Sequence, residues 1–229
     1  MRRVLSFLFG WCFIIVCVVF SIKSTALNPD FYIPKYEEME LASDIGVSKK
    51  DLNQSIRLLL DYLDDKRDDI KGHIMWYGVS QETFNEKETS HMVDVKVLYQ
   101  NALKVAKIAF IILGLVVLYF YLNDKTLMFA YLSKGFLMAM FTFILMLVFF
   151  GFWILTDFTS FWTWFHTIFF SNQLWLLDPN TDFMICMLPE TIFYKLVLAC
   201  VVKVICVMAL ASVLAIYYMV KKAPIGFER

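Results

Sequence analysis

The chain has 229 residues, of which 60% are hydrophobic and 17% aromatic, and its 21 basic and 21 acidic residues cancel at pH 7. A soluble domain of this length cannot bury so much apolar surface in one core, so the composition favours a membrane protein. The balanced charge leaves no excess of basic residues, which argues against nucleic acid as a partner.

Four apolar segments match the roughly 20 residues that cross a hydrocarbon core of about 30 Å. We assign the transmembrane helices to residues 1–22, 104–122, 135–155 and 193–220. The first segment also resembles a secretory signal, because Arg2 and Arg3 precede its apolar stretch and small residues follow it. That stretch is longer than the apolar part of a typical signal and contains Trp11, so we expect an uncleaved anchor.

The basic residues of the short connections predict how these helices are oriented, because short cytoplasmic segments are rich in Lys and Arg. Residues 123–134 and the tail at 221–229 contain basic residues, whereas the loop at residues 156–192 contains none. We therefore expect both termini in the cytoplasm and this loop outside the cell. Residues 23–103 contain ten basic residues but are long enough to cross regardless of charge, and we place them outside as well.

Residues 23–103 are expected to form a small extracellular α+β cap. Residues 28–34 contain two prolines and suggest an extended stretch. Ser48 and Asp51 then form a capping box, and the apolar face of the helix that follows consists of Leu52, Ile56, Leu59, Leu60 and Leu63. Residues 73–84 predict a short strand pair around a glycine turn. The predicted fold is thus mainly α: a polytopic membrane protein with four transmembrane helices, this cap and an aromatic interfacial loop.

A second helix is predicted to begin after Ser90 and to continue into the span at residues 104–122, because no Gly or Pro interrupts it. With Ser90 as N-cap, His91 falls in the first turn, where the helix dipole disfavours the imidazolium. Asp94 lies three residues later on the same face, within reach of one ring nitrogen. A neutral ring oriented by a carboxylate suits a general base.

Residues 157–190 contain neither Lys nor Arg, three of the six tryptophans and one of the three histidines, His166. On a helix, Trp162, Phe169 and Phe170 would flank this ring. For a single histidine, a place in an interfacial aromatic belt is the alternative. Two histidines at one interface, among aromatic side chains that exclude water, favour a functional site instead.

Four of the five cysteines fall inside the apolar spans, so Cys186 alone lies outside and no intrachain disulfide framework is expected. A nucleophilic role for Cys186 is an alternative, but its apolar neighbours favour an inert thiol. Asp178 and Asp182 flank a turn and are expected to cap it; participation of either one in the site stays open. Lys203 in the fourth span is a functional candidate or a snorkelling side chain.

Two strings in this chain resemble the bacterial lipoprotein intramolecular transacylases, the Lit family. They are ETSHMVDVK at residues 88–96 and the loop at residues 157–190, which contains Phe-x-x-Phe-Trp-x-x-Phe-His-x-x-Phe-Phe and Leu-Asp-Pro-x-Thr-Asp. The four-span layout and the length are similar as well. The resemblance implies transfer of an acyl chain from the sn-2 oxygen of a diacylglyceryl group to the α-amine of the N-terminal cysteine of the same lipoprotein. It also implies His91 and His166 as catalytic residues.

Because of its expected place at a helix start, we expect His91 to act as the main base, with Asp94 as its orienting residue. His166 has no carboxylate nearby in the sequence, and we expect it to protonate the leaving oxygen or steady the intermediate. The expected substrate-binding side chains are Trp162, Phe165, Phe169, Trp175 and Tyr62. No metal or other cofactor is expected, and the partners are diacylglyceryl-modified lipoproteins and membrane lipid. There are two alternatives. One is a metal-dependent membrane hydrolase that uses both histidines, Asp94 and an outer aspartate, and the other is a non-catalytic membrane binding protein.

Overall fold

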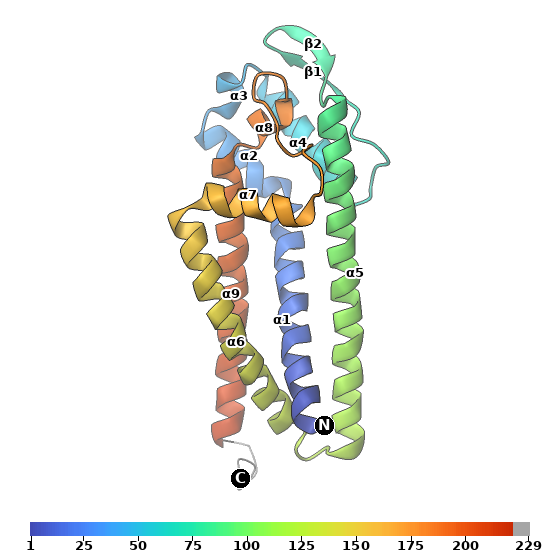
Figure 1. Ribbon diagram of the computed structural model, residues 1–229, viewed down its shortest axis with the longest axis vertical. Coiled ribbons are helices and arrows are strands. Elements are labelled where there is room, and N and C mark those ends of the chain that lie inside the picture. The colour runs from blue at the N-terminus through green and yellow to red at the C-terminus, as the bar shows by residue number, and fades with distance from the viewer. Residues whose placement is uncertain (222–229) are drawn as a thin grey trace. The chain divides into compact units, whose positions relative to one another are not determined.

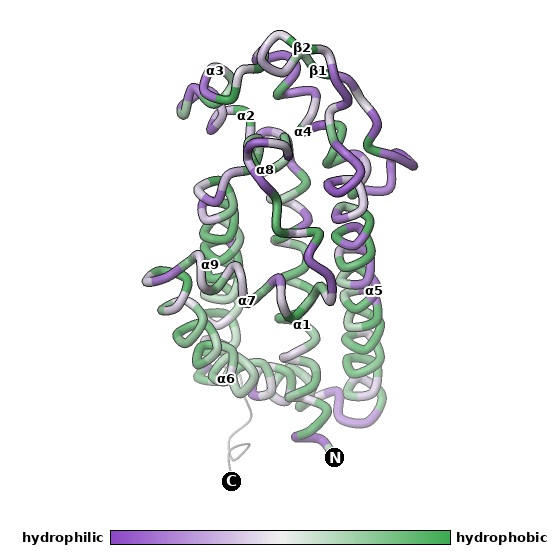
Figure 2. Tube along the Cα trace, turned by 45° about the horizontal axis from the view of Figure 1, so that its top comes forward, coloured by the Kyte–Doolittle hydropathy of each residue, from purple (hydrophilic) through white to green (hydrophobic). Residues whose placement is uncertain are grey.

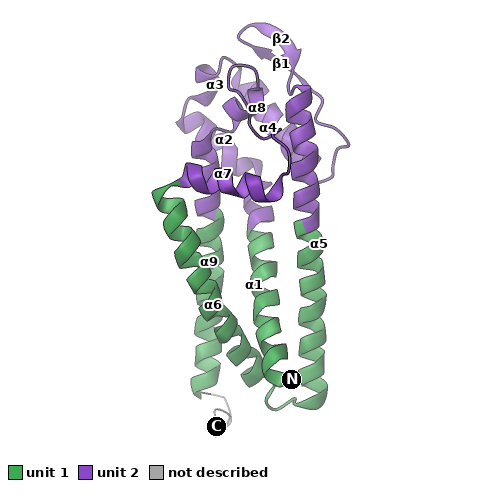
Figure 3. Cartoon of the chain, viewed as in Figure 1, with its two compact units in different colours: residues 1–21, 102–157, 200–229 green, residues 22–101, 158–199 purple. Residues whose placement is uncertain are grey.

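The computed structural model describes residues 1–221 and divides them into two compact units (Figure 3). The tail beyond it, with Lys222 and Arg229, lies outside the described residues. The helices are α1 (Arg2–Ala26), α2 (Pro29–Glu38), α3 (Leu41–Asp44), α4 (Lys49–Leu63), α5 (Glu86–Asn123), α6 (Met128–Thr156), α7 (Phe158–Phe169), α8 (Phe183–Met187) and α9 (Glu190–Lys221). Strands β1 (His73–Trp76) and β2 (Val79–Glu82) complete the described elements (Figure 1).

Four of the described helices, α1, α5, α6 and α9, are long and apolar enough to cross a membrane. Figure 2 shows the hydrophobic residues following one another along these helices, while polar residues gather around α2, α3 and the hairpin. This arrangement confirms the predicted fold class, which is mainly helical with four apolar spans and one small hairpin.

Unit 1 comprises residues 1–21, 102–157 and 200–221 of the described chain. Helices α1 and α6 approach closely at two glycines, Gly10 and Gly135. A Cβ atom added at Gly10 would stand 2.6 Å from the Cβ of Ala139, and one added at Gly135 would collide with the backbone carbonyl of Ser6. Small residues at such crossings let helix backbones pack in the absence of a hydrophobic driving force between helices in lipid.

Replacing Gly135 by alanine should therefore destabilise unit 1 by about 1–3 kcal/mol, the usual range for overpacking a filled contact. The matched control is Gly151→Ala in the same helix, because a Cβ there meets nothing within 4 Å and alanine favours a helix by about 1 kcal/mol. Thermal unfolding of the purified protein in detergent should show a lower midpoint for Gly135→Ala and an unchanged or higher one for Gly151→Ala. Equal midpoints would contradict the close approach.

Unit 2 comprises residues 22–101 and 158–199 and has its own apolar core. Helix α4 begins as predicted, since Oγ of Ser48 accepts a hydrogen bond from the backbone N–H of Asp51 at 3.0 Å. Leu52, Ile56, Leu59 and Leu60 are buried on its inner face. The hairpin pairs His73 with Glu82 in antiparallel register.

The predicted extended stretch at residues 28–34 is wrong, because these residues begin helix α2. Pro29 occupies the first turn, where a missing N–H costs nothing, and Asn28 caps the helix by accepting a hydrogen bond from the N–H of Asp30. Tyr32 and Tyr36 from this helix are buried in the core of unit 2.

The predicted start of α5 after Ser90 is also wrong. The helix begins at Glu86, and Asn85 and Glu88 cap its N-terminus. Oδ1 of Asn85 accepts from the N–H of Glu88 at 2.9 Å, and Oε2 of Glu88 accepts from the N–H of Asn85 at 2.7 Å. His91 therefore lies in the second turn, where the dipole of the helix end no longer acts strongly. The uninterrupted continuation of α5 to Asn123 is as predicted.

Candidate active site in unit 2

The ring of His166 lies inside a cluster of aromatic side chains near the end of α7. It is 8% exposed, and its ring centroid lies 4.8 Å from that of Trp162, one helical turn earlier. Trp175, from the segment after α7, stacks on the other side with a centroid distance of 4.9 Å and an interplanar angle of 29°. Phe165 lies against an edge of the ring at 5.6 Å. The histidine is therefore enclosed by apolar surfaces rather than by water.

His91 lies on α5 beside the same cluster. Its ring is 7% exposed, and its centroid is 6.1 Å from that of His166. Phe170 contacts both rings, at 5.2 Å from His91 and 5.6 Å from His166. Two imidazoles from distant parts of the sequence thus share one aromatic enclosure. A single substrate group between them could exchange protons with both.

The hydrogen bond of the His166 ring determines which nitrogen is basic. Nδ1 of His166 lies 2.7 Å from the carbonyl oxygen of Trp162. A carbonyl oxygen only accepts hydrogen bonds, so Nδ1 carries the proton in the neutral ring and Nε2 holds the lone pair. This arrangement, in which one nitrogen donates to a fixed acceptor and the other is free to accept, is that of a general base.

Burial keeps both rings uncharged. His91 belongs to the part of α5 that precedes the segment expected to span the membrane, at residues 104–122. Burial lowers the pKa of His91 to about 4, with a further reduction from the neighbouring His166, while Asp94 opposes the shift. Burial likewise lowers the pKa of His166, against the hydrogen bond to the Trp162 carbonyl. At neutral pH both imidazoles are therefore neutral.

Asp94 lies on α5 near His91 but makes its hydrogen bond elsewhere. Its Oδ2 atom accepts from Nδ2 of Asn172 at 2.8 Å. Within residues 1–221, Nδ1 of His91 is a buried nitrogen without a hydrogen-bond partner. Asp94 therefore acts on the histidine through its charge, and it ties α5 to the segment that follows α7. Asn172 was not identified from the sequence, because nothing local marks it as a partner of a residue on another helix.

The predicted substrate-binding side chains have different surroundings. Trp162, Phe165 and Trp175 contact the ring of His166 directly. Phe169 is half-exposed and packs on Phe165 at 4.8 Å. Tyr62 is buried in the core of unit 2, beneath the ammonium group of Lys96 at 4.3 Å from its ring centroid, and its ring contacts neither histidine.

A polar network joins the start of α5 to the loop before α8, and its function was not predicted. Glu88 is 1% exposed and accepts hydrogen bonds from the backbone N–H groups of Met184 and Asn85. Asp182 accepts from Asn85, at 2.8 Å, and from Lys87, at 3.0 Å. Burial raises the pKa of Glu88 to about 7. Burial alone would raise the pKa of Asp182, but its hydrogen bonds hold that pKa below the usual range.

The remaining candidates lie outside the histidine cluster. Burial raises the pKa of the Cys186 thiol, which donates to the carbonyl of Pro179, in agreement with an inert thiol. Oδ1 of Asp178 accepts from the N–H of Asn180, as expected for a turn cap. Lys203 belongs to unit 1. Residues 1–221 contain no group of three or more His, Cys, Asp or Glu arranged to hold a metal ion.

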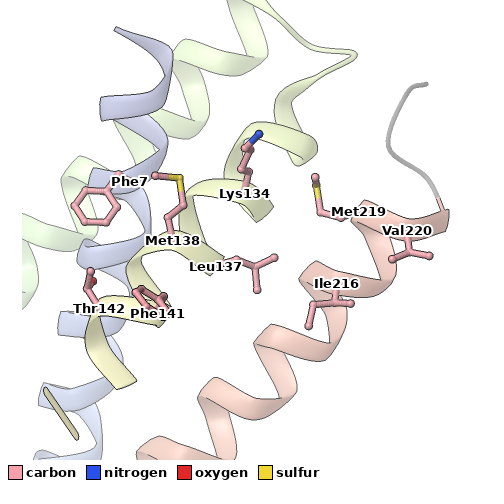
Figure 4. A pocket seen from close by; sticks show the side chains of 9 residues that line it. All are labelled: Phe7, Lys134, Leu137, Met138, Phe141, Thr142, Ile216, Met219 and Val220. Carbon is pink, nitrogen blue, oxygen red and sulfur yellow. The ribbon is translucent and has the colours of Figure 1, made fainter. Parts of the chain in front are cut away.

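A cavity of about 570 Å³ lies in unit 1 among α1, α6 and α9 (Figure 4). Its lining is apolar, apart from Thr142 and the ammonium group of Lys134. Neither residue is a nucleophile paired with a base, and both catalytic candidates belong to unit 2. The cavity therefore contains neither histidine.

Comparisons with known proteins agree with the resemblance in the sequence. A family model described as "Lipoprotein intramolecular transacylase Lit" matches residues 7–193. The chain is similar to the in meso structure of the membrane integral lipoprotein intramolecular transacylase Lit from Bacillus cereus, with a TM-score of 0.75, 21% identity and 97% of each chain covered. Variants of that protein with a histidine replaced by arginine or alanine match at 18% identity with TM-scores of 0.72, covering 97% of this chain and 93% or 94% of theirs. At this level of sequence identity, the similarity to these structures shows that the chain shares their fold. No curated protein matched the chain.

Proposed function

The chain belongs to the Lit family of lipoprotein intramolecular transacylases, and we propose that it moves one acyl chain within a single lipoprotein molecule. The observation that carries the proposal is that two buried imidazoles, with ring centroids 6.1 Å apart, share one aromatic enclosure. The donor is the sn-2 ester of the diacylglyceryl group on the N-terminal cysteine. The acceptor is the α-amine of the same cysteine, and the product is a lyso-form lipoprotein.

The proposed reaction needs no nucleophile from the protein. The amine nitrogen attacks the ester carbonyl carbon, an N–C bond forms, and the bond between that carbon and the glyceryl oxygen breaks. The nitrogen loses one proton and the glyceryl oxygen gains one, so no proton is consumed overall. Because both groups belong to one substrate, holding them in contact can lower the barrier by up to ~7–11 kcal/mol.

His166 suits the role of the base in this reaction. Its Nε2 atom holds a lone pair because Nδ1 donates to the Trp162 carbonyl. The same nitrogen, once protonated by the amine, can return the proton to the leaving glyceryl oxygen. This assignment differs from the expectation that His91 is the main base, which depended on a helix start at Ser90 that α5 does not have.

His91 suits the role of an uncharged hydrogen-bond donor. With its pKa lowered to about 4 by burial and by the neighbouring His166, the ring stays neutral and keeps one N–H to offer. A neutral donor stabilises the negative oxygen of the tetrahedral intermediate without competing for the substrate's proton. The unpartnered Nδ1 atom leaves hydrogen-bonding capacity that a bound substrate would satisfy.

The aromatic side chains around the rings would form the walls for the acyl chains. Trp162, Phe165 and Trp175 shield His166 from water, and the exposed ring of Phe169 extends this apolar surface outward. Exclusion of water matters here because water at the same ester would give hydrolysis instead of transfer. Tyr62, which the sequence also suggested as a substrate-binding residue, would reach the substrate only if the core of unit 2 moved.

The proposal places this site on the outer face of the bacterial cytoplasmic membrane, where diacylated lipoproteins are exposed, with both termini in the cytoplasm. Its support is the lack of Lys and Arg between residues 157 and 190. A phosphatase that is active only outside the cytoplasm should be inactive when fused to the C-terminus. An active fusion would reverse the orientation.

The function is tested by expressing the chain in cells whose lipoproteins carry two acyl chains and a free α-amine. Mass spectrometry of the N-terminal lipopeptide should show one acyl group moved from glycerol to nitrogen, with no change in total mass. Loss of one acyl chain would indicate a hydrolase. Unchanged acyl positions with a well-expressed protein would contradict the transfer reaction.

Asp94→Asn is expected to lower the rate by about tenfold, well below the ~10²–10⁴-fold that a general acid or base contributes. The asparagine oxygen can still accept the hydrogen bond from Asn172, so the fold stays intact while the charge near His91 is lost. Initial rates on a diacylated lipopeptide, together with the thermal unfolding midpoint, would measure both effects. Wild-type activity in this variant would remove Asp94 from the mechanism and leave the two histidines.

A further inference from the structure

Several polar contacts hold the segment between α7 and α8, together with the first turn of α8, onto the first turns of α5. Trp175 lies near the middle of that segment. At one end Asn172 donates to Asp94. Near the centre Nζ of Lys87 donates to the carbonyl oxygen of Leu176 at 2.6 Å. At the other end Glu88 accepts from the N–H of Met184. The backbone on both sides of Trp175 is therefore tied to α5.

Lys87 makes two of these contacts. Besides the Leu176 carbonyl, its ammonium group contacts Oδ2 of Asp182 at 3.0 Å, and the Asp182 carboxylate is only 3% exposed. A charge-assisted pair with one buried partner is held more firmly than a surface pair. Leu176 directly follows Trp175 in the chain. A displacement of Lys87 would therefore shift the backbone next to the tryptophan.

We propose that Lys87, supported by the buried Glu88, is a positioning residue that holds Trp175 against the ring of His166. The inference rests on the proposed function, in which His166 is the base. With Trp175 stacked at 4.9 Å, one face of the imidazole is shielded from water and its orientation is restricted. Without the Lys87 contacts, the backbone beside Trp175 loses its tie to α5 at Leu176, and water can reach the ring.

The chain suits a direct measurement, because it contains only three histidines. Their ring resonances can be assigned by single replacements, and the titration of His166 can then be followed by NMR in detergent. In Lys87→Met the His166 midpoint should move upward, toward the ordinary histidine value, because hydration of the ring favours the charged form. Lys87→Arg, which keeps the charge and can donate to both oxygens, should restore the wild-type midpoint.

Activity gives the second measurement. Lys87→Met should lower kcat by about tenfold, since displacement of about 1 Å from productive geometry costs up to ~10²-fold. The KM should change less than kcat, because the other walls of the enclosure, Trp162, Phe165 and Phe169, do not depend on Lys87. Lys66→Met is the matched control: Lys66 pairs with Asp64 at 3.0 Å in the same unit but has no contact with the segment. Its kcat and His166 midpoint should equal those of the wild type.

A double-mutant cycle separates positioning from loss of fold. If Lys87 acts through the tryptophan, Lys87→Met should add little to the effects of Trp175→Ala on both kcat and the His166 midpoint. Full additivity, or a folded Lys87→Met protein with an unchanged His166 midpoint and kcat, would overturn the proposal. A shifted midpoint in a protein whose wild type forms no lyso-form product would instead contradict the proposed function and leave the positioning role standing.

Discussion

Replacing His166 by alanine is expected to lower the rate of acyl transfer by about 10²–10⁴-fold, because a positioned general base contributes that much. The ring is the acceptor in this proposal, with Nδ1 committed to the Trp162 carbonyl and Nε2 available to the amine. The other imidazole in the same aromatic enclosure is that of His91. Its pKa, lowered to about 4 chiefly by burial, makes it a weak substitute for the base.

His166→Gln should be nearly as inactive as His166→Ala, since an amide cannot take a proton from the amine. Initial rates on a diacylated lipopeptide, quantified by mass spectrometry, would measure both variants. The matched control is His73→Ala, because His73 is exposed on β1 and takes no part in the histidine cluster. Activity of His166→Gln close to that of the wild type would show that His166 is not a base.

Replacing His91 by alanine is expected to cost about 10²–10³-fold in kcat, the loss usual for removal of one donor to a tetrahedral oxyanion. The ring is neutral because it is buried against Phe170 and near His166, so it offers an N–H at neutral pH. Removing it leaves the negative oxygen of the intermediate with one fewer partner in an enclosure that water does not enter.

His91→Gln distinguishes the two roles that the ring could have. An amide N–H can replace a neutral imidazole N–H as a donor, so His91→Gln should recover part of the activity lost in His91→Ala. If His91 were the base, both variants would be equally inactive. Both His91 variants would be measured with the same rate assay and by thermal unfolding. Their unfolding midpoints should stay close to that of His73→Ala. Recovery by glutamine at position 166 but not at position 91 would reverse the assignment.

Several features of the fold and one feature of the site could be predicted from the sequence, because their causes are local. The apolar stretches predicted four long helices, and the Ser48 cap predicted the start of α4. The aromatic spacing around His166 predicted its neighbours on α7, since residues four apart share a helix face. In each case a few consecutive side chains and the period of the helix were sufficient.

Two local predictions were wrong for identifiable reasons. The prolines at positions 29 and 34 suggested an extended stretch, yet Asn28 caps a helix that accommodates them and buries two tyrosines. Ser90 has the sequence pattern of an N-cap, but Asn85 and Glu88 cap the helix, and Asn85 lies five residues before Ser90. In both places burial and hydrogen bonds to other segments outweighed the preference of the local sequence.

The sequence by itself determined which segments are apolar enough to cross a membrane, that two histidines have aromatic neighbours, and which family motifs the chain contains. Only the tertiary structure decided that Phe170 also lies against His91, that Asp94 binds Asn172, and that Lys87 and Glu88 tie the segment around Trp175 to α5. The physical reason is range. A helical period acts over a few residues, whereas these contacts join positions 78 to 96 residues apart, and no local pattern specifies them.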